Sequence, residues 1–109
     1  MKNVQVSIEA CLACMVECEK CADGFLNVKD HLECVKLCRD CADICALCAR
    51  LCARDSKFAE ALCALCVKCC EDCANECSKH DMECCKKCAE ACNNVKNNQF
   101  NTKNISICF

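Results

Sequence analysis

The spacing of the cysteines constrains this chain more than any other feature. The sequence has 109 residues, 21 of them cysteine. All except Cys108 fall in four runs, and within each run the steps alternate mainly between three and four residues. This alternation is the a/d heptad repeat, which places side chains on one narrow stripe of a helix. Four such runs predict four helices.

The chain contains no proline, and Gly24 is the only glycine. Few residues can therefore interrupt a helix once it has started. We expect the first helix over residues 4–23, with Gly24 as a left-handed C-terminal stop and residues 25–29 as a turn. Asp30 is expected to cap the second helix, which runs to about residue 53, with Glu33 as its capping-box partner.

The remaining boundaries follow from polar residues between the cysteine runs. Asp55 and Ser56 are expected to break the chain and cap a third helix that extends to about residue 79. Asp81 is expected to cap a fourth helix that ends near residues 95–96. The Asn-rich segment 97–109 is predicted to be an irregular tail, outside a bundle domain of residues 1–96.

Short connections force neighbouring helices to run antiparallel. The predicted fold class is therefore all-α, an antiparallel up-down four-helix bundle with a cysteine-lined core. Leu, Ile, Val and Phe together number 23, which is few for a conventional core, so cysteine must fill much of it. The residues expected to provide apolar packing around the cysteine stripe are Leu12, Val16, Leu37, Ile44, Leu47, Leu51, Leu62 and Leu65.

Charge and the N-terminal sequence limit the partners and the compartment. The formal net charge is −2, so neither nucleic acid nor an anionic membrane is an expected partner. The first ten residues lack the apolar region of a signal peptide, and no apolar run is long enough to span a membrane. We therefore expect a cytoplasmic protein, in which thiols stay reduced and dense cysteines act as metal ligands rather than disulfides.

Helical geometry also disfavours disulfides. Side chains three or four residues apart on a helix have Cβ atoms about 5–6 Å apart, whereas a disulfide needs about 3.5–4.5 Å. A two-coordinate metal suits this spacing better, because two metal–sulfur bonds of ~2.3 Å span about 4.5 Å. Pairs of cysteines within one helix are therefore expected to bind a metal that accepts two or three sulfurs.

Charge selects Cu(I) among such metals. Buried thiolates must be neutralised, and one Cu⁺ per thiolate leaves the core near neutral, whereas one Zn²⁺ per four thiolates leaves −2 at each site. Thiolates also prefer soft ions such as Cu(I). The chain is predicted to store Cu(I), on the order of 20 ions if each buried thiolate is neutralised.

The predicted ligands are the cysteines of the four runs together with two histidines. His31 and His80 extend the heptad register at one end of the bundle, where Met82 also lies, and are expected to form a mouth for copper. Val4, Ser7, Ala59 and Val95 are expected to plug the other end, Met15 to pack in the core, and Cys108 to be no ligand. The predicted cysteine ligands are Cys11, Cys14, Cys18, Cys21, Cys34, Cys38, Cys41, Cys45, Cys48, Cys52, Cys63, Cys66, Cys69, Cys70, Cys73, Cys77, Cys84, Cys85, Cys88 and Cys92.

The sequence resembles the bacterial copper storage proteins, and specifically their cytosolic branch. The resemblance is carried by CLACMVECEKC (11–21), CVKLCRDCADICALCARLC (34–52), CALCVKCCEDCANEC (63–77) and CCKKCAEAC (84–92). It implies a four-helix bundle lined with Cu(I)-binding cysteines, an entrance near histidines and assembly into a homotetramer. Copper donor or acceptor proteins are the other partners that such a role implies.

Other functions fit the pattern less well. A metallothionein-like Zn²⁺ or Cd²⁺ buffer stays open as the alternative, although it would not need an intact heptad register. Iron–sulfur motifs usually place cysteines on loops, and a redox enzyme would need one distinctive cysteine, so no enzymatic activity is expected. A chaperone would need two or three exposed cysteines, and a copper-sensing regulator would need a basic DNA-binding face.

Overall fold

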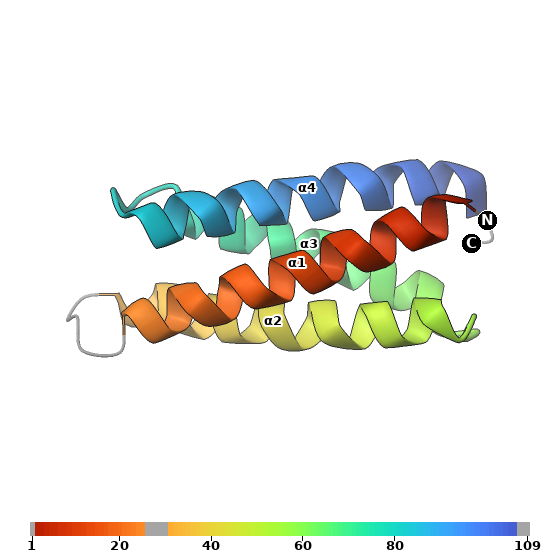
Figure 1. The fold of residues 1–109 in the computed structure, drawn as a ribbon, viewed down its shortest axis with the longest axis horizontal. Coiled ribbons are helices and arrows are strands. Elements are labelled where there is room, and N and C mark those ends of the chain that lie inside the picture. The colour runs from red at the N-terminus through yellow and green to blue at the C-terminus, as the bar shows by residue number, and fades with distance from the viewer. Residues whose placement is uncertain (1, 26–30, 107–109) are drawn as a thin grey trace.

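The chain folds into four helices that lie side by side (Figure 1). The computed structural model describes residues 2–25 and 31–106, with side chains described for 4–25 and 31–98. The helices are α1 (Lys2–Gly24), α2 (Leu32–Ala53), α3 (Ala59–Cys77) and α4 (Glu83–Ser106). The predicted all-α four-helix bundle is confirmed.

The helices form a narrow rod with a square cross-section. α1 packs beside α2 and α4, and α3 packs beside the same two helices, so each helix has two neighbours. The rod measures 43 × 18 × 18 Å. Figure 1 shows successive helices running in opposite directions, as the short connections require. None of the helices in the described part of the chain is both long and apolar enough to span a bilayer.

Cysteine fills the centre of this rod, as the sequence predicts. In the part of the chain whose side chains are described, the buried hydrophobic residues other than cysteine and alanine are Phe25, Leu51 and Val95. Most cysteines of the four runs are at most 1% exposed. Because the thiol is small and weakly polar, a stripe of cysteines can bring four backbones close together without large side chains.

The apolar residues beside the cysteine stripe are only partly covered. Leu37, Ile44 and Met15 pack against the core as expected, and Leu51 is 7% exposed. The expectation is wrong for four others, which are at least 40% exposed, because the narrow stripe fills the interior and leaves the flanking positions at the rim. These four residues are Leu12, Val16, Leu47 and Leu65.

The first helix ends where predicted but not in the predicted way. α1 ends at Gly24, yet no described glycine has a positive φ, so the left-handed stop is wrong. Instead the Phe25 N–H donates to the Ala22 carbonyl at 3.2 Å, which tightens the last turn into a 3₁₀ shape. A Cβ at Gly24 would lie 3.4 Å from Cys84 Sγ. A Cβ fits at this ordinary contact distance, so neither space nor a special backbone angle requires glycine at this position.

The start of α2 differs from the predicted cap. Its N-cap is His31, whose side chain makes no capping hydrogen bond. Asp30 and residues 26–29 of the predicted turn lie outside the described residues. Glu33 stands in the first turn, where a negative charge favours the helix N-terminus.

The later helix starts also shift by a few residues. The break at Asp55 is confirmed by its φ of 50°. Ser56 Oγ accepts a hydrogen bond from the Phe58 N–H at 3.1 Å, but α3 begins only at Ala59 and ends at Cys77 rather than near residue 79. Asp81 pairs with Lys86 at 3.1 Å while α4 begins at Glu83.

The fourth helix is longer than predicted. The expected end near residues 95–96 is wrong, and so is the irregular tail over residues 97–106, because α4 continues to Ser106. Residues 107–109 lie outside the described residues. Asn98 Nδ2 donates to the Asn94 carbonyl at 2.8 Å, which shows asparagine side chains accommodated along the helix. Without proline or glycine in this stretch, nothing stops the helix at residue 96.

Replacing Gly24 tests this account of the end of α1. Because the backbone there is not left-handed, Gly24→Ala should leave the free energy of unfolding unchanged or raise it by up to ~0.5 kcal/mol. The urea midpoint of the reduced, metal-free protein measures this. A loss of more than ~1 kcal/mol, which an L-residue forced to a positive φ would produce, would contradict the structure.

Candidate metal centre

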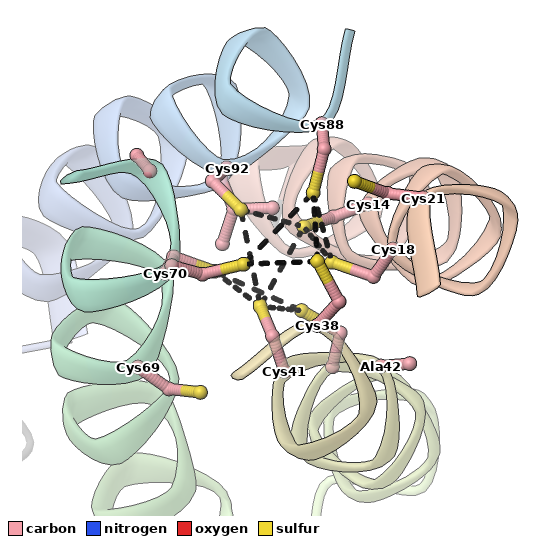
Figure 2. Packing of buried hydrophobic residues seen from close by; sticks show 14 of the residues in the cluster. Cys14, Cys18, Cys21, Cys38, Cys41, Ala42, Cys69, Cys70, Cys88 and Cys92 are labelled. Atoms are coloured by element: carbon pink, nitrogen blue, oxygen red, sulfur yellow. Dashed lines mark hydrogen bonds between the residues drawn. The ribbon is translucent and has the colours of Figure 1, made fainter. Parts of the chain in front are cut away.

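From the middle of the bundle to the end that holds the histidines, the sulfur atoms lie in layers, with one sulfur from each helix. The middle layer consists of Cys14, Cys41, Cys70 and Cys92 (Figure 2). Cys14 Sγ lies 3.6 Å from Cys92 Sγ and 3.9 Å from Cys41 Sγ, and Cys41 Sγ lies 3.6 Å from Cys70 Sγ. Thiols from segments up to 78 residues apart in the chain therefore meet at the bundle axis.

Two further layers continue towards the end that holds the histidines. In the first, Cys88 Sγ lies 3.6 Å from Cys18 Sγ, 3.8 Å from Cys38 Sγ and 3.9 Å from Cys73 Sγ. Cys38 also lies 3.9 Å from Cys77 and so joins this layer to the next. The end layer contains two close pairs, Cys21–Cys85 and Cys34–Cys77, each at 3.8 Å.

In the opposite direction the thiols continue mainly on α2 and α3. Cys66 Sγ lies 4.0 Å from Cys11 Sγ and 3.7 Å from Cys45 Sγ. Beyond them, Cys63 Sγ lies 3.7 Å from both Cys48 and Cys52. We call the continuous set of layered thiols the seam; it comprises Cys11, Cys14, Cys18, Cys21, Cys34, Cys38, Cys41, Cys45, Cys48, Cys52, Cys63, Cys66, Cys70, Cys73, Cys77, Cys85, Cys88 and Cys92.

Two predicted plug residues explain why the thiols at this end of the seam lie mainly on α2 and α3. Ser7 of α1 and Val95 of α4 are at most 1% exposed and occupy positions where cysteine would continue the stripe. Val4 and Ala59 are half-buried. The thiols of α2 and α3 therefore extend further than those of α1 and α4.

Most close thiol contacts join different helices, which the sequence did not predict. The spacing argument expected pairs within one helix, and Cys14–Cys18 at 3.8 Å and Cys41–Cys45 at 3.9 Å are such pairs. The shorter contacts, such as Cys18–Cys88, cross between helices. Heptad spacing identifies the stripe, but the pairing across the axis depends on the relative register of the helices.

All twenty cysteines in the described part of the chain are free thiols. A metal with bonds of ~2.3 Å would hold its sulfurs about 4.0 Å apart in a trigonal site, 3.8 Å in a tetrahedral site and 4.6 Å in a linear site. The observed separations of 3.6–4.0 Å require little movement for the first two geometries. Distance alone therefore does not select the metal.

Sharing of thiols between neighbouring groups is more selective. Several sets of four sulfurs lie within 4.8 Å of one another, and these sets overlap. Cys14 and Cys41 belong to the same two sets, and Cys38 and Cys77 to another two. Separate four-thiolate zinc sites would use each thiol once, so overlapping sets could not all be filled. An array of ions that shares bridging thiolates can use every cysteine.

Within a close pair of thiols, the pKa of one is lowered and the pKa of the other is raised. The pKa of Cys14 is lowered because Cys18, and after it Cys41, donates S–H bonds that stabilise the Cys14 thiolate. The same contact raises the pKa of Cys18. At the histidine end, burial raises the pKa of Cys34 and Cys85. Near neutral pH such thiols keep their protons until a cation replaces them.

The structure brings the two predicted histidines together. The ring centroids of His31 and His80 lie 4.4 Å apart. His31 precedes Cys34 by three residues and His80 follows Cys77 by three, and both cysteines belong to the end layer. His80 Nε2 lies 3.0 Å from Glu76 Oε2, and the hydrogen bond from His80 lowers the pKa of Glu76. Met82, the third residue predicted at this mouth, is 38% exposed.

Sequence reasoning missed two residues at this end. Phe25 was placed in a turn, but it is 2% exposed and its ring stacks on His31 at 4.4 Å. Glu76 was not singled out, although its position four residues before His80 is a signal for a contact on one helix face. No sequence signal identified Phe25, because its burial depends on how α1, α2 and α3 meet.

The three cysteines outside the seam have different positions. Cys69 is 9% exposed on the flank of α3, and Cys84 is half-buried beside Gly24. Both positions agree with the predicted place beside the stripe. Cys108 lies outside the described residues.

Comparison with known proteins identifies the family. Residues 1–102 match the family model for copper storage proteins. The chain belongs to the copper storage protein family. Among relatives of this family member, the uncharacterized cysteine-rich protein YhjQ of Bacillus subtilis (strain 168) is 46% identical over 80 residues, which cover 71% of this chain and 74% of the relative.

Solved copper storage proteins share the fold as well as the sequence pattern. The Cu(I)-bound copper storage protein BsCsp3, from Bacillus subtilis, superimposes with a TM-score of 0.86 at 41% identity, covering 91% of this chain and 96% of its own. A cytosolic copper storage protein from Streptomyces lividans, loaded with five coppers, gives a TM-score of 0.88 at 31% identity, with coverage of 92% and 91%.

The raised thiol pKa values predict how the stability of the metal-free protein depends on pH. An unfolded cysteine ionises near its ordinary pKa of about 8.5, whereas folded Cys34 and Cys85 keep their protons to higher pH. Above pH ~8.5 the unfolded state binds fewer protons, so the free energy of unfolding falls as pH rises. The contribution of these two thiols to the urea midpoint, measured under reducing, anaerobic conditions, should therefore fall between pH 8 and 10 and stay constant between pH 6 and 8.

A double variant provides the control for this dependence. Cys34→Ala with Cys85→Ala removes two of the contributing thiols and should make the fall in midpoint shallower. An identical slope in the variant and the original protein would show that these buried thiols do not cause the effect.

Proposed function

We propose that this protein stores Cu(I) by binding many ions along the thiol seam. The single observation that carries the proposal is the continuity of the seam: layers of thiols 3.6–4.0 Å apart, with four-sulfur groups that overlap. A chaperone or a single catalytic centre needs one such group. Here such groups repeat along most of a rod 43 Å long, which allows one chain to bind many ions.

Charge neutrality supports Cu(I) as the stored ion. Each thiolate that enters the core brings one negative charge, and one Cu⁺ cancels it, so the loaded core stays near neutral. Separate zinc or cadmium sites with four thiolates each leave −2 at each site, and the overlapping four-sulfur groups could not all be filled in this way. The known proteins with this fold described above are bound to copper, which also favours copper over the zinc or cadmium alternative.

The proposed ligands are the eighteen seam cysteines, with Cys69, Cys84 and the two histidines as additional ligands. Cys69 and Cys84 would add bridging sulfurs at the flank. His31 and His80, 4.4 Å apart, would provide exchangeable ligands where copper enters, and the Glu76 carboxylate would orient His80. Phe25 covers this mouth by stacking on His31.

The cellular setting follows from the same role. We place the protein in the cytoplasm, where thiols are kept reduced; the Streptomyces protein of the same fold is a cytosolic copper storage protein. Assembly into a homotetramer, exchange with copper donor or acceptor proteins, and storage without catalysis belong to this proposal. Residues 1–96 would form the storage domain, with 97–109 as an extension whose first part continues α4.

Copper capacity tests the proposal directly. The fully reduced protein is titrated anaerobically with Cu(I) in the presence of a chromophoric copper chelator of known affinity. The chelator should stay colourless until roughly 18–21 equivalents per chain have been added, because charge neutrality requires about one ion per thiolate. Saturation at one to five equivalents would refute storage and favour a chaperone or a discrete cluster.

Removing one layer of the seam tests which residues bind. A variant with Cys14, Cys41, Cys70 and Cys92 all changed to Ser should lose about four equivalents of capacity, since each thiolate neutralises about one ion. Cys108→Ser is the matched control and should lose less than one equivalent. Circular dichroism must first show that the variant keeps its helices. An unchanged capacity in the layer variant would place copper outside the seam.

A further inference from the structure

A groove on the outside of the bundle, between α2 and α3, leads to a cysteine that is not part of the seam. The groove has a volume of about 330 Å³, and Cys69 lines it together with Asp40, Asp43 and Asp72. Figure 2 shows the Cys69 sulfur outside the network of dashed contacts and directed towards α2. Cys69 thus lies at the groove, outside the network of seam thiols.

Cys69 stands between solvent and the middle layer of the seam. It is 9% exposed, and among the described residues it has no sulfur partner in the 3.6–4.0 Å range that joins the seam thiols. Its side chain points towards α2, the helix that carries Cys41 (Figure 2). Cys41 in turn lies 3.6 Å from Cys70.

The groove carries a negative charge next to this thiol. Lys68 pairs with Asp72 at 3.0 Å, so three aspartates and one lysine leave a net charge of −2 along the groove. Leu37 and Ile44 form apolar walls beside these carboxylates. Charges of one sign beside low-dielectric walls focus the field and raise the local concentration of cations.

We propose that this groove is a lateral uptake site for Cu(I), in which Cys69 takes the ion from a neutral or cationic carrier and passes it to Cys41. This inference rests on the proposed storage function. It adds a route that reaches the middle layer directly, whereas an ion that enters at His31 and His80 must first pass two layers. The carboxylates attract the ion, and the soft thiol binds it.

The transfer is a ligand exchange without redox chemistry. The bond between Cu(I) and its carrier ligand breaks, a Cu–S bond to Cys69 forms, and the thiol proton leaves to the released ligand or to solvent. A second Cu–S bond then forms to Cys41, whose proton leaves in the same way, and the bond to Cys69 breaks or becomes a bridge. Copper stays in the +1 state throughout.

The kinetics of loading test the role of Cys69. The tetrakis(acetonitrile)copper(I) cation is mixed anaerobically with reduced protein in a stopped-flow instrument, and the near-ultraviolet thiolate-to-copper absorption is followed. His31→Ala with His80→Ala serves as background to weaken the end route. In that background Cys69→Ala should slow the initial rate about tenfold, the lower end of the range for electrostatically focused sites.

Cys108→Ala is the control. Cys108 is a cysteine that is predicted to be no ligand, and it is not among the residues that line the groove. Its loss should change the rate less than about twofold, which is small beside the effect of a focused field. Equal rates for Cys69→Ala and Cys108→Ala would overturn the lateral site. Cys69→Ser, which keeps the size of the side chain but not its softness, should behave like Cys69→Ala and guards against a packing effect.

A charge variant tests the groove without removing any thiol. Asp40→Asn with Asp43→Asn, both on exposed side chains, should slow loading from the cationic probe about threefold at low ionic strength and reduce its salt dependence. Loading from the anionic bis(bathocuproine disulfonate) complex of Cu(I) should not slow. An unchanged rate with the cationic probe would overturn the proposal.

The two proposals fail in different ways. If the original protein saturates at one to five equivalents, storage fails, while the rate effect of Cys69 can still be measured on the first equivalent. If capacity is about 20 equivalents, as charge neutrality requires, and neither the Cys69 nor the aspartate variants alter the rate, only the lateral site fails.

Discussion

Contact between sulfur atoms at the axis of the bundle is the constraint on which the rest of this structure depends. Thiols from four helices approach to 3.6–4.0 Å, and large side chains could not occupy the same positions in a rod 18 Å wide. A neutral thiol packs as a small hydrophobic group and a thiolate is a soft metal ligand. The same residues can therefore hold the metal-free core together and bind the cargo.

This double role limits what else the core can contain. Buried thiolates without cations would repel one another at these distances, so ionisation and metal binding must occur together. The raised pKa values of buried thiols such as Cys34 and Cys85 express that coupling in the metal-free state. Apolar residues are correspondingly displaced to the rim, where Leu12 and Leu65 are more than 40% exposed.

The two ends of the bundle differ, because not every helix carries a thiol at each level of the rod. At one end the seam reaches a cluster of Phe25, His31 and His80, and at the other Ser7 and Val95 replace thiols on two helices. The middle layer lies nearest to the groove that contains Cys69. Histidine, aspartate and a flanking cysteine thus stand where the thiol core approaches solvent, and none of them lies within the seam itself.

Cysteine spacing determined the four helices and the cysteine-lined core, and the charge and softness of the thiolates determined the choice of Cu(I), because heptad periodicity and thiolate chemistry are local properties of the chain. It also placed His31 and His80 at one end. The tertiary structure decided what depends on how helices meet: the pairing of Cys14 with Cys92 across the axis, the burial of Phe25, and the position of Cys69 between groove and seam. The length of α4 was missed because the absence of helix breakers outweighed the Asn-rich composition. Register between helices is set by the packing of all four at once, which no local pattern encodes.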